Sequence, residues 1–232
     1  MAPIIEVNNS ALERLEKLSI EYSLVNKNNQ LKDTKDFIYV PSINLYVAKE
    51  RTHLRKNWFD LKKNWFDCHK LLQQENKRMM IIPEFIEFLK YTKENYKDIY
   101  NEITEIKSPW RGEWLDANFE AKDNELYINF NHRLNSDGSL TPKNSEILDE
   151  NTLMRDKSSG ISLEDWLENP IKQGLPTNKT VKKGNLSYTY PRSYDNSVAM
   201  FDASEFMAGL DCNMDPSTMD DFNLGVRAVK IE

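Results

Sequence analysis

The sequence predicts an α+β fold, in which helices come first and several short strands follow. Two observations predict it. In the first half of the chain, apolar residues recur at spacings of three and four, as they do on one face of a helix. All seven glycines lie at or beyond Gly112, and short β-like runs there are separated by Asp, Asn, Pro, Ser and Gly. We therefore expect an extended and helical first half and a turn-rich second half.

The N-terminal 47 residues predict three elements in order. Residues 10–25 predict a short helix with Ser10 as its cap, and residues 26–35 predict a polar loop. Residues 37–47 predict an extended segment, because apolar side chains recur along it, and Pro41 indicates an edge or a bend.

Two longer helices are expected next. The first lies within residues 48–76, where large apolar residues fall at helical spacing and Lys-Asn-Trp-Phe-Asp occurs twice, seven residues apart. Its stripe comprises Trp58, Leu61, Trp65, Cys68 and Leu72. The second begins at Pro83, since proline suits the first turn of a helix. Its buried side comprises Phe85, Phe88, Leu89, Tyr96, Ile99 and Ile103.

The second half predicts strands and turns. Residues 125–130 alternate between apolar and polar as in a half-buried strand, and residues 135–138 predict a turn. Short β-like runs recur at residues 197–201, 206–210 and 224–231. Two helices followed by short antiparallel strands complete the expected α+β architecture.

A chain of 232 residues suits one sizeable domain with a small appendage. We expect an N-terminal extension over residues 1–36 and a single domain over residues 37–232. No apolar run approaches the roughly 20 residues that a membrane span needs, and the N-terminus lacks the pattern of a signal peptide. Virion, extracellular and intracellular locations stay open.

Charge argues against nucleic acid as a partner. Residues 194–223 contain seven acidic residues and no Lys or Arg, and such a surface repels phosphate. Residues 49–78 carry nine Lys or Arg against four acids, but these interleave with the apolar stripe, as on the outer face of an amphipathic helix.

Motifs for catalysis are not found. The sequence has no nucleophile elbow, phosphate-binding loop, dinucleotide fingerprint or His-Glu-x-x-His, and no pattern of acid–base partners surrounds His53, His69 or His132. Cys68 and Cys212 predict two buried free thiols. We therefore expect no enzyme, no cofactor and no metal.

Residues 211–222 match a calcium-binding loop in part. Asp211, Asn213 and Asp215 match alternate positions of an EF-hand loop, but Pro216 stands where glycine is needed and Phe222 where glutamate is needed. The EF-hand assignment fails, which leaves a looser cation site and a solvated acidic loop as alternatives.

Several segments resemble a known family. The segments are residues 160–170, 172–176, 190–193, 196–199, 215–216 and 224–228, the last reading Leu-Gly-Val-Arg-Ala. They look like the variable proteins of archaeal diversity-generating retroelements, as do residues 79–91, 109–117 and 142–145. The resemblance covers about residues 37–232. It implies a C-type-lectin-like fold of the formylglycine-generating-enzyme branch and a gene whose 3′ end a reverse transcriptase rewrites at adenines. The cysteine pair of that enzyme branch is missing, so its catalysis is not implied.

The resemblance implies a ligand-binding display protein with a variable region at about residues 188–228. Aromatic and Met side chains mingle there with small polar ones, as in antibody binding loops. The expected ligand-contacting residues are Tyr194, Asp195, Met200, Asp202, Glu205, Phe206, Met207, Gly209, Asn213, Met214, Met219, Asp220, Asp221 and Phe222. The expected ligand is a protein or glycan on a target surface.

Two other functions stay open. The first is an enzyme of the same fold branch, either metal-dependent or oxidase-like. The second is an intracellular interaction protein that recruits a partner through residues 10–25. Either would compete with ligand display as the role of this chain.

Overall fold

The computed structural model describes residues 33–53, 64–105, 108–192, 196–217 and 224–230. The chain divides into two compact units, residues 1–32 and 33–232, and the fold below is that of the second unit. The helix expected at residues 10–25 lies outside the described residues, as do Trp58 and Leu61 of the expected stripe and nearly all of the expected N-terminal extension.

A small sheet has the strand order β1-β2-β13-β4. Strands β1 (Phe37–Val40) and β2 (Leu45–Ala48) form an antiparallel hairpin with Pro41 in the turn. The extended backbone and the bend at Pro41 are as the sequence predicts, but the one expected segment is two paired strands. Strand β13 (Ala228–Lys230) pairs with both β2 and β4 (Lys77–Met79).

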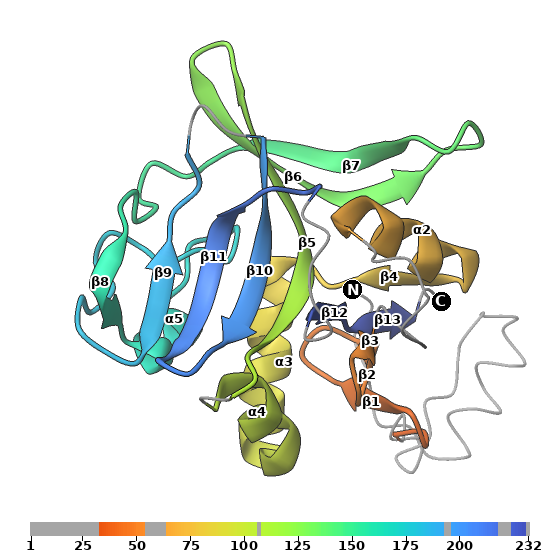
Figure 1. Cartoon of the computed structure of the whole chain (residues 1–232), viewed down its shortest axis with the longest axis horizontal. Coiled ribbons are helices and arrows are strands. Elements are labelled where there is room, and N and C mark those ends of the chain that lie inside the picture. Colours follow the sequence, from red (N-terminus) through yellow and green to blue (C-terminus); the bar gives the residue numbers. More distant parts are fainter. Residues whose placement is uncertain (1–32, 54–63, 106–107, 193–195, 218–223, 231–232) are drawn as a thin grey trace, which may run out of the picture. The chain divides into compact units, whose positions relative to one another are not determined.

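A large sheet has the strand order β3-β12-β5-β10-β11-β9-β8, and β6 and β7 extend it from β5 (Figure 1). Its strands are β3 (Thr52–His53), β12 (Leu224–Val226), β5 (Arg111–Lys122), β10 (Ser197–Ala203), β11 (Ala208–Met214), β9 (Leu186–Thr189), β8 (Lys157–Ile161), β6 (Glu125–Leu134) and β7 (Leu140–Ile147). Two strands pair with the same edge of β5: β12 pairs with its residues 112–114, and β6 pairs with its residues 118–122.

Helices cover both faces of the large sheet. Helices α3 (Ile82–Asn95) and α5 (Leu163–Glu168) pack on one face of β10, where the ring of Phe201 lies 5.1 Å from that of Phe85. Helix α4 (Lys97–Thr104) follows α3 after a break at Tyr96, where a single helix was expected. Helix α2 (Trp65–Gln74) lies beside β4 and β6 (Figure 1). Among the described helices, none combines the length and apolar character needed to cross a membrane.

The expected fold class is wrong. Of the described residues, 42% are in strands and 22% in helices, so the structure is mostly β. It has four described helices where two were expected, β5 and β6 run for 12 and 10 residues, and the β11–β9 and β12–β5 pairs are parallel. Residues 48–53, expected in a helix, belong to β2, a bend and β3.

Hydrophobic periodicity does not predict strands β5 and β7, and the reason is physical. The first seven residues of β5 are all buried, so apolar and polar residues do not alternate along them. Strand β7 is exposed along most of its length and reads as a polar segment, Leu-Thr-Pro-Lys-Asn-Ser-Glu-Ile. Hydrophobic periodicity reports burial on one face, and neither strand has it.

The core forms two clusters. The larger includes Phe85, Phe88, Trp166, Phe201 and Leu210, between the large sheet and helices α3 and α5. The smaller forms around helix α2 and includes Trp65, Cys68, Leu72, Trp114 and Met200. Both cysteines are free and buried, as predicted.

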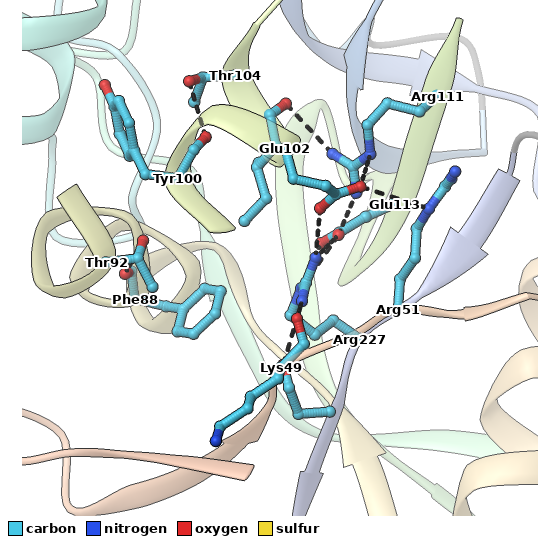
Figure 2. A network of polar contacts seen from close by, with 12 residues as sticks. Lys49, Arg51, Phe88, Thr92, Tyr100, Glu102, Thr104, Arg111, Glu113 and Arg227 are labelled. Atoms are coloured by element: carbon cyan, nitrogen blue, oxygen red, sulfur yellow. Dashed lines mark hydrogen bonds and ion pairs between the residues drawn. The ribbon is translucent and has the colours of Figure 1, made fainter. Parts of the chain in front are cut away.

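A buried ion network joins the two sheets. Arg227 stands between β12 of the large sheet and β13 of the small sheet. Figure 2 shows its guanidinium beside the carboxylates of Glu113 and Glu102, with Arg111 on the other side of Glu113. Arg227 also donates to the backbone carbonyls of Ala48 and Lys49. Because these contacts reach β5, α4 and the end of β2, the network fixes the crossing between the sheets.

Candidate functional site

Strands β9, β11 and β10 bury one face and leave part of the other in contact with solvent. On the inner face, the side chains of Tyr188, Phe201 and Leu210 belong to the core. On the outer face, the strand register sets Asp202 opposite Gly209, and Gly209 opposite Ser187. The next row pairs Asp211 with Thr189. We call Ser187, Thr189, Asp202, Gly209 and Asp211 the β9–β11–β10 face.

Two carboxylates dominate the electrostatics of this face. Burial, aided by the charge of Asp211, raises the pKa of Asp202 to about 7 against the opposing charge of Arg111. Burial also raises the pKa of Asp211, while a hydrogen bond from the Asn213 amide at 2.8 Å opposes the shift. Partly desolvated carboxylates favour a ligand that supplies a hydrogen-bond donor or a positive charge.

The loop between β10 and β11 projects at one end of the face. Phe206 is 83% exposed, the largest exposure among the described large hydrophobic residues. Ser204 holds the loop, since its hydroxyl donates to the Met207 carbonyl and accepts from the Phe206 amide. Glu205 is exposed and accepts a hydrogen bond from Ser108.

The expected ligand-contacting residues are found in three environments. Glu205 and Phe206 are exposed, and Asp202, Met207, Asn213 and Met214 are half-buried. Met200 and Gly209 are buried, which corrects the expectation that they are exposed: Met200 packs in the smaller core cluster, and Gly209 lies under Asp202. The others lie outside the described residues: Tyr194, Asp195, Met219, Asp220, Asp221 and Phe222.

Neither Cys212 nor the acids near it form a reactive site in the described part of the tail. Burial, with the nearby charge of Asp211, raises the pKa of the Cys212 thiol well above its usual range, so it stays protonated. The carboxylates of Asp211 and Asp215 each accept a hydrogen bond from a backbone amide two residues on, at 2.8 Å. Both carboxylates are therefore engaged with the local backbone, Asp211 within β11 and Asp215 in the turn that follows it.

A second group of polar side chains lies buried between α2, β5 and β6. Asp116 Oδ1 lies 2.5 Å from His132 Nδ1 and 3.6 Å from His69 Nε2, and Asp116 Oδ2 accepts the His132 backbone amide at 3.1 Å. The exposed fractions of the three side chains are 1%, 5% and 0% for Asp116, His132 and His69. Neither ring nitrogen of His69 has a hydrogen-bond partner. Burial lowers the pKa of His69 to about 4, although Asp116 opposes the shift, so its imidazole is neutral at pH 7.

Neighbouring contacts hold these three residues in place. Trp65 precedes His69 by one helical turn, donates its indole N–H to the Leu115 carbonyl at 2.9 Å, and sets its ring 4.2 Å from the His69 ring. Gln73, one turn after His69, donates to the His132 carbonyl and accepts the Leu134 amide, at 3.0 and 2.8 Å. The helix is thus tied to β5 beside Asp116 and to β6 at His132.

A pocket of about 290 Å³ opens beside the cluster. His132 and Trp65 line it together with Asn118, Asn129 and Glu120. His132 therefore borders space open to small molecules or water, and Asp116 lines a second pocket of about 240 Å³.

No sequence pattern indicates this cluster, because its members come from three different elements: Asp116 follows His69 by 47 residues, and His132 follows Asp116 by 16. A predicted β5–β6 hairpin would have brought Asp116 near His132, but β5 has no strand-like alternation. Within β6, Asn131 adopts a left-handed backbone conformation with φ of 57°, one residue before His132.

Comparison with protein-family models, with curated proteins and with solved structures finds no match. The C-type-lectin-like fold implied by the family resemblance thus has no support from any solved structure, and it is replaced by the mostly β architecture described above.

Proposed function

We propose that this chain is a ligand-binding protein that contacts a protein or glycan through the β9–β11–β10 face and the loop between β10 and β11. The observation that carries the proposal is that Phe201 and Leu210 belong to the core, while Asp202 and Asp211, which follow them in the chain, are partly exposed and the loop between the two strands exposes Phe206. The proposal uses the β structure described here and needs no C-type-lectin fold.

The separation of the two faces supports a binding role. A change at a packed position such as Phe201 or Leu210 disturbs close packing, which costs several kcal/mol of a total stability of about 5–15 kcal/mol. Asp202, Asp211 and Phe206 do not belong to either core cluster. A surface of this kind accepts many side chains while the scaffold stays folded.

The chemistry of the face supports the same role. Phe206 offers apolar contact area to a partner, and aromatic side chains do so at low cost in conformational entropy. Asp202 and Asp211 add carboxylates whose raised pKa values reflect partial desolvation. Together they suit a partner that presents hydroxyl or amine donors beside an apolar patch.

Diversification by a retroelement belongs to this proposal and depends on the sequence resemblance. It requires a near-identical template repeat in the neighbouring DNA, differing at adenines, beside a reverse transcriptase gene. Sequencing the flanking DNA tests this part, and a locus with neither feature would contradict it.

Selection from a library tests the binding role. Asp202, Glu205, Phe206, Met207 and Asp211 are randomised in the full chain, which is displayed on yeast and selected for binding to lysozyme and, separately, to a biotinylated oligosaccharide. We expect folded binders whose affinity is lost when the selected residues revert.

A second library supplies the control. It randomises five exposed residues on or near β7, namely Thr141, Lys143, Ser145, Ile147 and Glu150. The proposal expects enrichment from the first library well above that from the control. Equal enrichment from both, or loss of protease resistance throughout the first library, would contradict it.

A further inference from the structure

We propose that His69 Nε2, Asp116 Oδ1 and His132 Nδ1 bind a divalent transition-metal ion of the zinc class, with one coordination position left open. These three residues form the one group of possible metal ligands found among the described residues, and their ligand atoms lie within 4.8 Å of one another. The inference is independent of the proposed function, because the cluster lies between α2, β5 and β6 and shares no residue with the β9–β11–β10 face.

The donor set is the first argument. Two imidazole nitrogens and one carboxylate oxygen form a common ligand set for zinc, and two His with one carboxylate also serve non-haem iron. Sites with three protein ligands keep a further position for water or substrate, whereas structural zinc sites are closed by four. The composition therefore indicates an open site.

The spacing is the second argument. Bonds of about 2.0–2.2 Å in a tetrahedral site separate the ligand atoms by about 3.3 Å. His69 Nε2 and Asp116 Oδ1 are already 3.6 Å apart. The hydrogen bond of 2.5 Å between His132 Nδ1 and Asp116 Oδ1 must open by about 0.8 Å when a metal ion replaces the shared proton. This movement is within reach of small side-chain rotations.

The unpartnered imidazole of His69 is the third argument. Its side chain is fully buried, and neither ring nitrogen has a hydrogen-bond partner. Burying a polar group without a partner is costly, and native structures rarely do so without a reason. A cation between His69 and Asp116 would give the Nε2 lone pair a partner and would balance the charge of the buried carboxylate.

The surroundings fix the ligands before any metal arrives. Asp116 Oδ2 is held by the His132 amide, so Oδ1 is directed toward the two imidazoles. Trp65 and Gln73 tie the helix that carries His69 to β5 and β6. In metalloproteins, contacts of this kind orient the residues that bind the metal ion directly. The pocket lined by His132 gives water a route to the cluster.

Titration of the full-length chain with Co²⁺ and Zn²⁺ tests the proposal. After treatment with a chelator, Co²⁺ should bind at one equivalent with the intense visible absorption of a four-coordinate ion, and Zn²⁺ should displace it. His69→Gln, Asp116→Asn and His132→Gln should each weaken Co²⁺ affinity by at least about 100-fold. His53→Gln is the matched control, since this histidine lies on β3, and it should leave binding unchanged.

Two further measurements keep the outcome decisive if a variant fails to fold. In the wild-type chain, the melting temperature should rise with Zn²⁺ concentration, and the ring nitrogen signals of His69 and His132 in ¹⁵N NMR should shift on Zn²⁺ addition. No Co²⁺ spectrum, no Zn²⁺-dependent shift of these nitrogens, or binding that all three cluster variants retain would each overturn the proposal.

Discussion

Arg227 Nη2 lies 2.6 Å from Glu113 Oε1, and both side chains are buried at the point where the chain passes from the large sheet to the small one. Burial by itself raises the pKa of Glu113, but the charges of Arg227 and Arg111 outweigh it and lower the pKa to about 2. The carboxylate therefore stays ionised at any ordinary pH and holds both guanidinium groups. Arg227 belongs to the segment Leu-Gly-Val-Arg-Ala that resembles the variable-protein family, and its role here is structural.

Replacement of Glu113 should therefore destabilise the domain strongly. Glu113→Gln removes the negative charge between Arg111 and Arg227 and leaves Glu102 as their remaining carboxylate partner. Breaking a buried ion pair from one side costs about 3–5 kcal/mol, so the free energy of unfolding in urea should fall by about that amount. Lys172→Ala, which removes an exposed ion pair with Glu146, is the control and should change it by less than about 1 kcal/mol. Equal effects of the two changes would show that the network contributes no more than a surface pair.

Asp202 should make the domain less stable as pH rises through neutrality. Its folded pKa of about 7 lies above the ordinary value of 3.8, so between these values the folded state binds more protons than the unfolded state. The stabilisation from the protonated carboxyl is complete below about pH 4 and is lost by about pH 8. Asp202→Asn should therefore raise the free energy of unfolding at pH 8 by on the order of 1–3 kcal/mol, and by much less at pH 4. Urea titrations at the two pH values measure this difference, and an equal effect at both would contradict the raised pKa.

Sequence patterns predicted the elements that bury one face. The spacing of Trp65, Cys68 and Leu72 predicted a helix whose apolar side is buried, and the alternation at residues 125–130 predicted part of β6. The turn at residues 135–138 is also confirmed, with Gly138 donating its amide to the Asn135 carbonyl. In each case local periodicity or turn chemistry carries the information.

The rest depends on contacts between distant residues. Arg111, Glu113 and Asp116 are charged, yet they lie in a fully buried stretch of β5. Glu113 pairs with Arg227, and Asp116 contacts His69 and His132, so both depend on residues far along the chain, while Arg111 pairs with Glu113 and Glu102. A single sequence does not show which distant residues are in contact. For this reason neither the mostly β architecture nor the His–Asp–His cluster was predicted. The burial of Met200 was not predicted for a related reason. Its side chain lies on the face of β10 opposite Phe201, but residues of α2 and β12 cover it there.

Two glycines should respond differently to alanine. A Cβ at Gly209 would lie 2.5 Å from Asp202 Oδ1, the mobile end of a side chain, whereas a Cβ at Gly184 would clash with the backbone of Ile161 and Ser162. Gly209→Ala should therefore change the free energy of unfolding by less than about 1 kcal/mol, since Asp202 can rotate away. Gly184→Ala should lower it by about 1–3 kcal/mol, as forced overpacking does. Urea unfolding of both variants checks the comparison, and a larger loss at Gly209 would show that the β9–β11–β10 face does not tolerate variation.

Phe201 and Phe206 offer the sharpest comparison between the core and the proposed binding surface, because the same residue type occurs at both. Phe201 is fully buried and packs against Phe85 and Trp166, while Phe206 is 83% exposed. Phe201→Ala should lower the free energy of unfolding by about 3–5 kcal/mol through lost burial and the cavity it leaves. Phe206→Ala should change it by no more than about 0.5 kcal/mol, since surface replacements away from packed sites rarely do more. Thermal and urea unfolding distinguish the two. A loss at Phe206 of more than about 2 kcal/mol would mean that this ring is packed in solution, and an exposed aromatic contact could then no longer be part of the proposed function.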